Sequence, residues 1–331
     1  MIKVGLIGHG FMGGMHAACY KQIANAKLVA VADVRSEKLE GFKEEGIEVY
    51  ATGMELIEKA DVDVVDICLP THLHTEHAVA AMKAGKSVFL EKPACLTKEE
   101  GKLLLDVQKE TGAIVQVGQV LRFMDEYLYL KKINDTKEYG KLISATLARK
   151  SPLPTWAWEG WLHDTSKSGS VAHDMHIHDV DFVRFLLGEP DSFKTTVARD
   201  NDGVLSHIFT SFVYGSTCVN TEATWDLPAG FPFSPSFLLK FEKATIVNDA
   251  QGLRKYLADG SCEEIKLEPA FKAENDIGGN ISDLGGYYVE LKYFVDKLDA
   301  GETPDVAPLC EGVKSANLVL DEVASVGGAK I

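Results

Sequence analysis

The sequence lacks the long apolar runs from which membrane-spanning helices are built. None of its 331 residues lies in an apolar run that approaches the length of about 18 residues needed to cross a bilayer. Because the first apolar strand begins at residue 2, we expect no signal peptide before it. Positive charge is in short supply, and the net charge of −15 disfavours nucleic acids and anionic membranes as partners.

Paired cysteines are missing as well. The six cysteines are scattered, with no C-x-x-C pair, which favours free thiols in a reducing compartment over a disulfide framework. We therefore expect a cytoplasmic protein. The chain contains no internal repeat and no low-complexity linker, and it is long enough for two domains, each with its own core.

The first clear motif is a glycine-rich turn between a strand and a helix. Residues 2–7 form an apolar strand pattern that leads directly into Gly8-His9-Gly10-Phe11-Met12-Gly13 and then into a helical stretch. In this arrangement Gly8 allows a tight turn, Gly10 lets the backbone approach a pyrophosphate, and Gly13 lets the helix pack on the strand. The phosphates are then expected at the helix N-terminus, where unpaired N–H groups favour anions.

An acidic residue follows at the spacing expected for a dinucleotide site. The second apolar strand, residues 27–32, ends at Asp33, whose carboxylate can bind the ribose hydroxyls. Since a carboxylate there repels a 2′-phosphate, we expect NAD as the cofactor, with NADP disfavoured. Arg35 lies close enough in the sequence to weaken that preference.

A lysine stands at the end of another short strand. Residues 87–90 form an apolar strand that closes in Glu91-Lys92-Pro93, and the chain must turn there because Pro93 has a fixed φ and no backbone donor. The carboxyl ends of parallel strands are where open α/β sheets bind ligands. Lys92 is therefore a candidate for acting on a substrate beside the nucleotide.

Two sheet types are predicted along the chain. Strands alternate with helices in residues 1–120, which predicts an α/β Rossmann domain with a doubly wound parallel sheet. Strands in series predict an α+β domain with an open antiparallel sheet in residues 121–331. The later strands are expected near residues 142–150, 206–214, 217–225 and 236–241, and the later helices near residues 122–137, 174–187, 287–300 and 308–326.

Five motifs together resemble the Gfo/Idh/MocA oxidoreductases. They are Gly8-His9-Gly10-Phe11-Met12-Gly13, Pro70-Thr71-His72-Leu73-His74, Glu91-Lys92-Pro93, Asp174-Met175-His176-Ile177-His178-Asp179 and Tyr287-Tyr288-Val289-Glu290-Leu291. The resemblance extends over nearly the whole chain, and the fourth motif looks particularly like the inositol dehydrogenases. It implies a Rossmann domain that carries NAD(P), an open sheet that carries substrate and subunit contacts, and hydride transfer at a hydroxyl of a sugar or cyclitol.

The motifs and the resemblance define the residues expected at the site. Catalysis is assigned to Lys92, Asp174 and His178. Substrate contacts are expected from Arg122, Trp161, His176 and Tyr287, although His176 stands where the family usually has a small residue. Cofactor contacts are expected from Gly8, Gly10, Phe11, Met12, Gly13, Asp33, Arg35, Leu69, Pro70, Thr71, His74, Glu91 and Lys92.

The three catalytic candidates suit the oxidation of a secondary alcohol. Asp174 and His178 are four residues apart, so on a helix they share one face. Histidine titrates near neutral pH, so His178 can take the hydroxyl proton while Asp174 orients the ring and stabilises the imidazolium. Lys92 can bind the same oxygen and stabilise its developing negative charge.

Other interpretations remain open at this point. The segment from His173 to His178 is dense in histidine and could hold a metal, although no carboxylate or cysteine cluster obviously completes such a site, so we expect none. The same Lys-Asp-His set could serve a glycosidase that uses NAD transiently, or the chain could be a non-enzymatic sensor of sugar or nucleotide. The resemblance also implies a homodimer or homotetramer, because an open sheet face is unfavourable alone.

Overall fold

The protein divides into two compact units, described here from a computed structural model of residues 1–271 and 284–329. The first unit contains residues 1–123 and 270–314, and the second contains residues 124–269 and 315–331. A single boundary near residue 120 was expected. The chain instead returns, since residues 284–314 pack with the first unit although they follow the whole second sheet.

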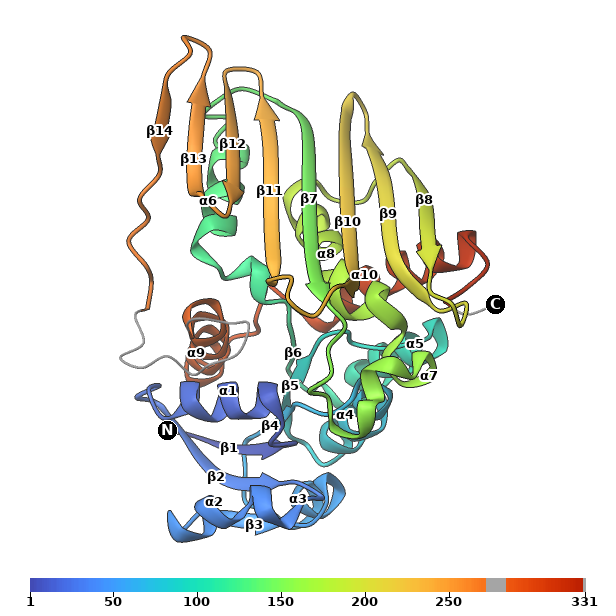
Figure 1. The fold of residues 1–331 in the computed structure, drawn as a ribbon. Coiled ribbons are helices and arrows are strands. Elements are labelled where there is room, and N and C mark those ends of the chain that lie inside the picture. The colour runs from blue at the N-terminus through green and yellow to red at the C-terminus, as the bar shows by residue number, and fades with distance from the viewer. Residues whose placement is uncertain (272–283, 330–331) are drawn as a thin grey trace. The chain divides into compact units, whose positions relative to one another are not determined.

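The first unit is built on a six-stranded parallel sheet with the strand order β3-β2-β1-β4-β5-β6, which confirms the predicted doubly wound α/β arrangement (Figure 1). The strands are β1 (Ile2–Ile7), β2 (Ala26–Ala32), β3 (Glu48–Tyr50), β4 (Val64–Ile67), β5 (Ser87–Glu91) and β6 (Val115–Gly118). Its α-helices are α1 (Phe11–Tyr20), α2 (Glu40–Glu44), α3 (Gly53–Lys59), α4 (His74–Lys83), α5 (Lys98–Thr111) and α9 (Gly285–Asp299). Short 3-10 turns are η1 (Ser36–Lys38), η2 (Thr71–Leu73) and η3 (Val120–Arg122).

Local signals explain where these elements start and stop. Helix α5 begins with a capping box, in which the Thr97 side chain accepts from the Glu100 backbone and Glu100 reaches back to the Thr97 backbone. It ends at Gly112, whose φ of 71° suits a residue without a Cβ. Strand β4 is buried along its whole length, as expected for a central parallel strand.

Helix α9 completes the core of the first unit from far away in the sequence. The ring of Phe294 on α9 meets that of Phe89 on β5, with centroids 5.6 Å apart, and both side chains are fully buried. Figure 1 shows α9 alongside α1. The end of this segment also adds backbone pairing, because the Val117 N–H donates to the Ala307 carbonyl over 3.0 Å.

The second unit is built on an eight-stranded sheet with the order β14-β13-β12-β11-β7-β10-β9-β8. Its strands are β7 (Leu142–Pro152), β8 (Ser192–Arg199), β9 (Leu205–Tyr214), β10 (Thr217–Leu227), β11 (Ser234–Phe241), β12 (Ala244–Asp249), β13 (Gly252–Leu257) and β14 (Cys262–Glu264). Its helical segments are α6 (Asp125–Asp135), η4 (Trp158–His163), α7 (Thr165–Ser168), the π-helical η5 (Ala172–His176) and α8 (Ile177–Leu187). Helix α10 (Leu309–Ser325) begins in the first unit and ends in the second.

One face of this sheet forms the core of the second unit. Alternate residues such as Leu147, Phe212, Val219 and Leu239 are buried on that face. Figure 1 shows α6 and α8 on one side of the sheet. The opposite face carries the intervening side chains, most of which are polar or partly exposed. The predicted open sheet is confirmed, with one difference.

The difference is that the sheet is not wholly antiparallel. Strands β7 and β10 pair in parallel, because the long connection after β7 carries α8 and two further strands before β10 returns beside it. Strands β8, β12, β13 and β14 were not located from the sequence.

Two helix predictions also need correction. The helix expected from residue 122 starts at Asp125, and Arg122 instead ends the 3-10 turn η3. The helix expected from residue 174 is π-helical over its first residues and becomes α-helical only at Ile177. Within residues 1–271 and 284–329, no helix combines the length and the apolar character required to cross a membrane.

Candidate functional site

The turn after β1 leaves no room for side chains at two of its glycines. Gly8 has a φ of 89°, and a Cβ there would lie 2.5 Å from the Cys68 carbonyl oxygen. A Cβ on Gly13 would lie 1.8 Å from the carbonyl oxygen of Gly8. These approaches press the start of α1 against the ends of β1 and β4, as the glycine pattern predicted.

Gly10 differs from these two because it borders open space. No atom lies within 4 Å of an added Cβ, and Gly10 is the N-cap of α1 without a side chain that caps the helix. The first turn of α1 also carries no acidic residue. This helix N-terminus therefore suits the pyrophosphate of a dinucleotide, since its N–H groups and dipole favour an anion.

Asp33 lies beside this turn and is fully engaged by protein donors. Its Oδ1 accepts hydrogen bonds from the backbone and Nε of Arg35, at 2.9 and 2.8 Å. Its Oδ2 accepts from the His9 N–H and from Arg35 Nη2, both at 2.8 Å. Partial burial acts to raise the pKa of Asp33, but these hydrogen bonds outweigh it and hold that pKa below its usual value.

The arrangement of Asp33 has a consequence for a bound ribose. A carboxylate offers about four acceptor positions, and all are used by Arg35 and His9. Ribose hydroxyls can reach Asp33 only by sharing these positions or by displacing the Arg35 guanidinium, whose side chain is 21% exposed.

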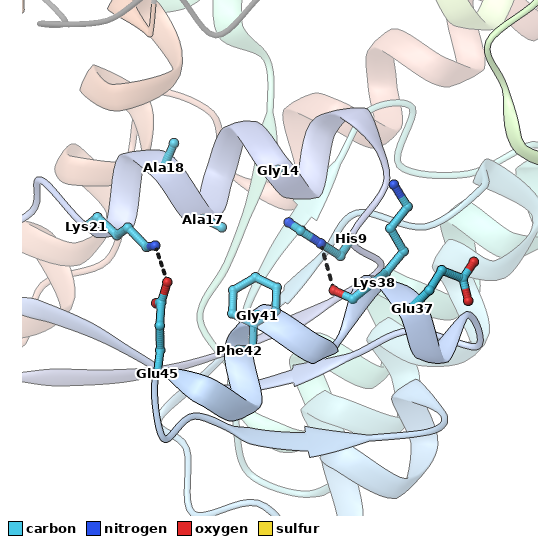
Figure 2. Close-up of a pocket in the computed structure, with 10 residues that line it drawn as sticks. All are labelled: His9, Gly14, Ala17, Ala18, Lys21, Glu37, Lys38, Gly41, Phe42 and Glu45. Carbon is cyan, nitrogen blue, oxygen red and sulfur yellow. Dashed lines mark hydrogen bonds and ion pairs between the residues drawn. The ribbon is translucent and has the colours of Figure 1, made fainter.

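A hollow of about 420 Å³ lies on the flank of this region, between α1 and α2 (Figure 2). The His9 ring stands edge-on to the Phe42 ring at 4.7 Å, and His9 Nδ1 lies 3.2 Å from the Lys38 carbonyl oxygen. None of the residues expected to contact the cofactor lines this hollow. This hollow is therefore separate from the predicted cofactor contacts at Gly10 and Asp33.

The loops that follow β4 and β5 are tied together by His74. Its Nδ1 lies 2.9 Å from the Pro93 carbonyl oxygen and its Nε2 lies 2.8 Å from that of Leu69. Burial, the largest cause, lowers the pKa of His74. Both ring nitrogens thus face backbone oxygens, so His74 holds the Leu69–Pro70–Thr71 loop against the chain after Lys92 instead of offering a polar contact to a cofactor.

Glu91 also turns away from the expected cofactor position. Its carboxylate is buried, and its Oε1 lies 3.1 Å from Nε2 of His16 on α1. Its Oε2 accepts the backbone N–H of Lys92 over 3.0 Å. Lys92 itself is half-buried at the carboxyl end of β5, as predicted.

Sequence reasoning missed the group that surrounds Glu91. His16 and Glu290 are fully buried next to it, although Glu290 lies in one of the quoted motifs and His16 follows Gly13 by three residues. One feature of the sequence does point to this group, because ionisable residues stand on the otherwise apolar faces of α1 and α9. Ionisable side chains are almost never buried without partners.

In the second unit, Asp174 and His178 stand out by their exposure. Between residues 171 and 184 every side chain is buried except these two, which are half-buried. Asp174 lies in the π-helical turn η5, and His178 lies in the first turn of α8. Irregular π turns of this kind are frequent at functional sites.

Buried polar contacts fix the rotation of α8. Asp179 accepts a hydrogen bond from Arg149 Nη2 over 2.9 Å, and both side chains are nearly inaccessible. Asp181 and Arg184 are bridged by the Ser315 hydroxyl, at 2.6 and 2.7 Å. Breaking such a buried pair from one side costs about 3–5 kcal/mol, so these contacts hold α8 with one face outward.

The other histidines of this segment are committed to the interior. His176 is fully buried with its Nε2 2.7 Å from Glu322 Oε2, which does not fit the predicted substrate contact. His173 Nδ1 lies 3.0 Å from the Gly169 carbonyl oxygen, and burial lowers the pKa of His173 to about 4. The two rings therefore face separate partners, in contrast to the shared metal considered from the sequence.

The remaining substrate candidates divide between the units. Arg122 is buried and its Nη1 donates to the Val306 carbonyl over 2.6 Å, and Tyr287 is buried on α9. Trp161 is half-buried in η4 of the second unit. Of the three, Arg122 has a structural contact of its own, because it ties η3 to the segment before α10.

Comparison with protein families identifies the chain. Residues 2–119 match the model described as "Oxidoreductase family, NAD-binding Rossmann fold", and residues 127–247 match the "GFO/IDH/MocA C-terminal domain". The chain belongs to the Gfo/Idh/MocA family. The predicted family is thereby confirmed, and residues 2–119 are its NAD-binding domain.

Individual relatives of this family member are inositol and sugar dehydrogenases. The chain is 34% identical to the myo-inositol 2-dehydrogenase of Thermotoga maritima over 57% of its own length and 55% of that protein, so the match spans little more than half of either. It is 27% identical to the inositol 2-dehydrogenase of Pseudomonas savastanoi pv. phaseolicola over 91% of its length and 87% of that protein. The structure of levoglucosan dehydrogenase with NADH and levoglucosan shares the fold, with a TM-score of 0.85 at 22% identity over 98% and 97% of the two chains.

The glycines generate a matched pair of variants. We expect Gly13→Ala to lower the free energy of unfolding by about 3 kcal/mol or more, because its methyl group would overlap the Gly8 carbonyl. Gly10→Ala should change stability by no more than about 1 kcal/mol but weaken NADH binding about tenfold or more, because its methyl group enters the space left for phosphate. Urea unfolding and NADH fluorescence titration measure the two effects. Equal NADH affinity in Gly10→Ala and the unmodified protein would contradict the assignment of the phosphates to this turn.

Proposed function

We propose that this protein is an NAD-dependent dehydrogenase that oxidises a secondary hydroxyl of an inositol-like cyclitol or a sugar. The observation that carries the proposal is the paired exposure of Asp174 and His178 on an otherwise buried helix. An ionisable pair that is partly accessible on such a helix suits proton transfer to and from a bound substrate. The names of the relatives support the substrate class.

Each catalytic candidate takes a defined role in this proposal. His178 accepts the proton of the substrate hydroxyl, and Asp174 orients the ring and stabilises the imidazolium. Lys92 donates to the same oxygen and stabilises the negative charge that develops as the carbon loses hydride. NAD, when bound, supplies the hydride acceptor. Lys92 belongs to the first unit and the other two residues to the second.

Three residues remain candidates for substrate contacts. Trp161 offers an aromatic face, which packs well against the apolar face of a sugar or cyclitol ring. Arg122 and Tyr287 keep this role only if a bound substrate reaches them in their buried positions. The transient-oxidation glycosidase would use the same catalytic groups and is separated from a dehydrogenase by the products.

For the cofactor we infer a preference for NAD over NADP. Asp33 is ionised at neutral pH, since its pKa is lowered, and a carboxylate at that position repels a 2′-phosphate. Arg35 favours NADP binding only when its guanidinium leaves Asp33, because it is otherwise bound to that carboxylate.

We also propose that the protein assembles as a homodimer or homotetramer through the open sheet face. Four large side chains on that face, Phe209, Val213, Leu238 and Tyr256, are between 38% and 42% exposed. The same face carries a polar group in which Glu222 pairs with His207 and Lys150, both at 3.0 Å. Exposed apolar side chains together with paired polar groups suit a surface that a second copy covers.

A reducing, cytoplasmic location fits the thiols of the chain. All six cysteines are free, and Cys218, Cys262 and Cys310 are exposed. Exposed unpaired thiols are stable in a reducing compartment and oxidise outside it.

The catalytic roles are tested by Lys92→Met and His178→Ala. We expect each substitution to lower kcat about 10²–10⁴-fold while NADH affinity changes little, because both groups act on the substrate hydroxyl. Lys83→Met and His163→Ala serve as controls, because they remove the same types of side chain at exposed positions. Turnover is measured by NADH formation over inositols, aldoses and sugar acids. Release of free sugar without net NADH formation would favour the glycosidase. If the unmodified protein shows neither activity, both enzymatic functions are contradicted.

The cofactor preference is tested by Asp33→Ser and Arg35→Met. Asp33→Ser should weaken NAD binding about tenfold or more, the equivalent of one charge-assisted hydrogen bond, and should improve NADP binding because Arg35 is released. Arg35→Met should disfavour NADP further. Dissociation constants for both reduced cofactors provide the measurement, and an unmodified protein that binds NADPH more tightly would contradict the inference.

The oligomer is tested by the double substitution Phe209→Lys and Leu238→Lys. Two added charges on the open face should shift the protein to monomers, because burying them without partners is unfavourable. Light scattering gives the mass, with Lys83→Glu on the exposed end of α4 as the control for a surface charge change. A monomeric unmodified protein at micromolar concentration would rule out the assembly.

A further inference from the structure

Four ionisable side chains from four elements meet in the interior of the first unit. His16 comes from α1, Asp66 from β4, Glu91 from β5 and Glu290 from α9, and none of them is more than 4% exposed. His16 Nδ1 lies 2.8 Å from Asp66 Oδ2, and His16 Nε2 lies 3.1 Å from Glu91 Oε1. We call these four residues the His16 cluster.

The charges of the His16 cluster do not balance if every group is ionised. One imidazolium would face three carboxylates, which leaves two negative charges without water. The negative charge of Asp66 is stabilised by further donors, since Tyr20 donates to its Oδ2 over 2.9 Å and the Cys68 thiol lies 3.4 Å from its Oδ1. The excess negative charge therefore falls on Glu91 and Glu290.

Glu290 is the group best placed to hold a proton. Neither of its carboxyl oxygens accepts a hydrogen bond from a described residue, and Glu91 Oε1 has the ion-pair contact with His16 Nε2 but no well-aligned hydrogen bond from a described residue. Ligand atoms of His16, Glu91 and Glu290 all lie within 4.8 Å of one another. Burial, followed by repulsion from Glu91, raises the pKa of Glu290 well above its usual value.

The second carboxylate oxygen of Glu91 contacts the backbone of Lys92. Glu91 Oε2 accepts the Lys92 backbone N–H, so whatever fixes this carboxylate also fixes the backbone of the lysine. Gly118, which faces Glu91 across the β5–β6 ladder, leaves room for the carboxylate, since a Cβ there would lie 3.0 Å from Oε1. Displacement of a reacting group by about 1 Å can cost about 100-fold in rate.

We propose that Glu290 retains a proton which it shares with Glu91, and that this pair, held by His16, positions Lys92 for its action on the substrate hydroxyl. The positioning part rests on the function proposed above, whereas the shared proton does not. Glu290 is thus a positioning residue that acts through Glu91 and touches no substrate.

A divalent cation is the competing occupant of the same place. A histidine whose second nitrogen binds a carboxylate, as His16 binds Asp66, is a common metal ligand. Among the described residues, however, this group supplies three ligand residues, while a structural zinc site uses four. One proton satisfies two carboxylates with no further ligand, so we favour the proton.

The shared proton is tested with Glu290→Gln, Glu290→Leu and Phe294→Leu. Glutamine keeps the size and the neutral state of a protonated glutamate, and leucine removes the polar group. Phe294→Leu is the matched control for packing, because Phe294 is buried one turn along the same helix. Infrared difference spectra should show a protonated carboxylic acid at neutral pH in the unmodified protein and in Phe294→Leu, and this band should be lost in Glu290→Gln.

Stability against pH gives an independent measurement. Since the pKa of Glu290 is raised on folding, the folded protein keeps a proton that the unfolded chain releases above its ordinary pKa of 4.5. Its contribution to stability is complete below that pH and is lost as the pH rises towards the folded pKa. Glu290→Gln has no such proton, so its Tm should rise relative to that of the unmodified protein as the pH is raised above about 4.5.

The positioning role is tested by kinetics on a polyol. Glu290→Leu should lower kcat about tenfold or more with an unchanged KM for NAD, and Glu290→Gln should restore kcat to near the original value. Equal losses in Glu290→Gln and Glu290→Leu, or no loss in Glu290→Leu, would overturn the positioning role.

Other outcomes separate this inference from the proposed function. Absence of the infrared band, a Tm difference that does not change with pH, or one equivalent of bound metal in the purified protein would overturn the shared proton. If the unmodified protein oxidises no polyol, the proposed function fails and the positioning role fails with it. The infrared and melting measurements still decide whether Glu290 holds its proton.

Discussion

The need to neutralise buried charge is the constraint on which both units depend. Away from water, an ionised side chain needs a partner of opposite charge or must change its protonation state. In the first unit this requirement gathers α1, β4, β5 and α9 around His16. In the second unit it joins β7 to α8 through Arg149 and Asp179, and α10 to the π-helical turn through Glu322 and His176. Because few rotations of these helices satisfy such pairs, the same contacts determine which side chains reach the surface.

Much of the fold followed from local patterns, and the failures have physical causes. The alternation of strands and helices predicted the parallel sheet, since fully buried strands such as β4 read as short apolar runs. The strands of the second sheet were harder to predict. Strand β8 alternates weakly, with Thr195 as its one buried residue, and the exposed β14 carries no apolar signal. The parallel pairing of β7 with β10 depends on tertiary packing, which no local window contains.

For the candidate site, backbone geometry was more predictable than side-chain direction. Glycine spacing correctly indicated where the chain at Gly8 and Gly13 comes into close contact, because that requirement is local. The direction of Glu91 was not predictable, since its partner Glu290 lies about two hundred residues later and becomes a neighbour only in the folded unit. The pairing of His176 with Glu322 was equally unpredictable, because the two residues are far apart in the sequence and meet only in the folded unit.

The return of residues 284–314 to the first unit also bears on the order in which the protein is made. The parallel sheet leaves the ribosome early, yet Phe89 and the buried face of α1 gain their cover only when α9 has been synthesised. During synthesis, N-terminal domains generally fold first, as soon as all their residues have been made. Here the nucleotide-binding unit must wait, with apolar and charged surface exposed, while the whole second sheet is translated. The nascent chain is therefore most vulnerable to aggregation or chaperone capture during that interval. The second unit is completed later still, because the end of α10, with Glu322, belongs to it.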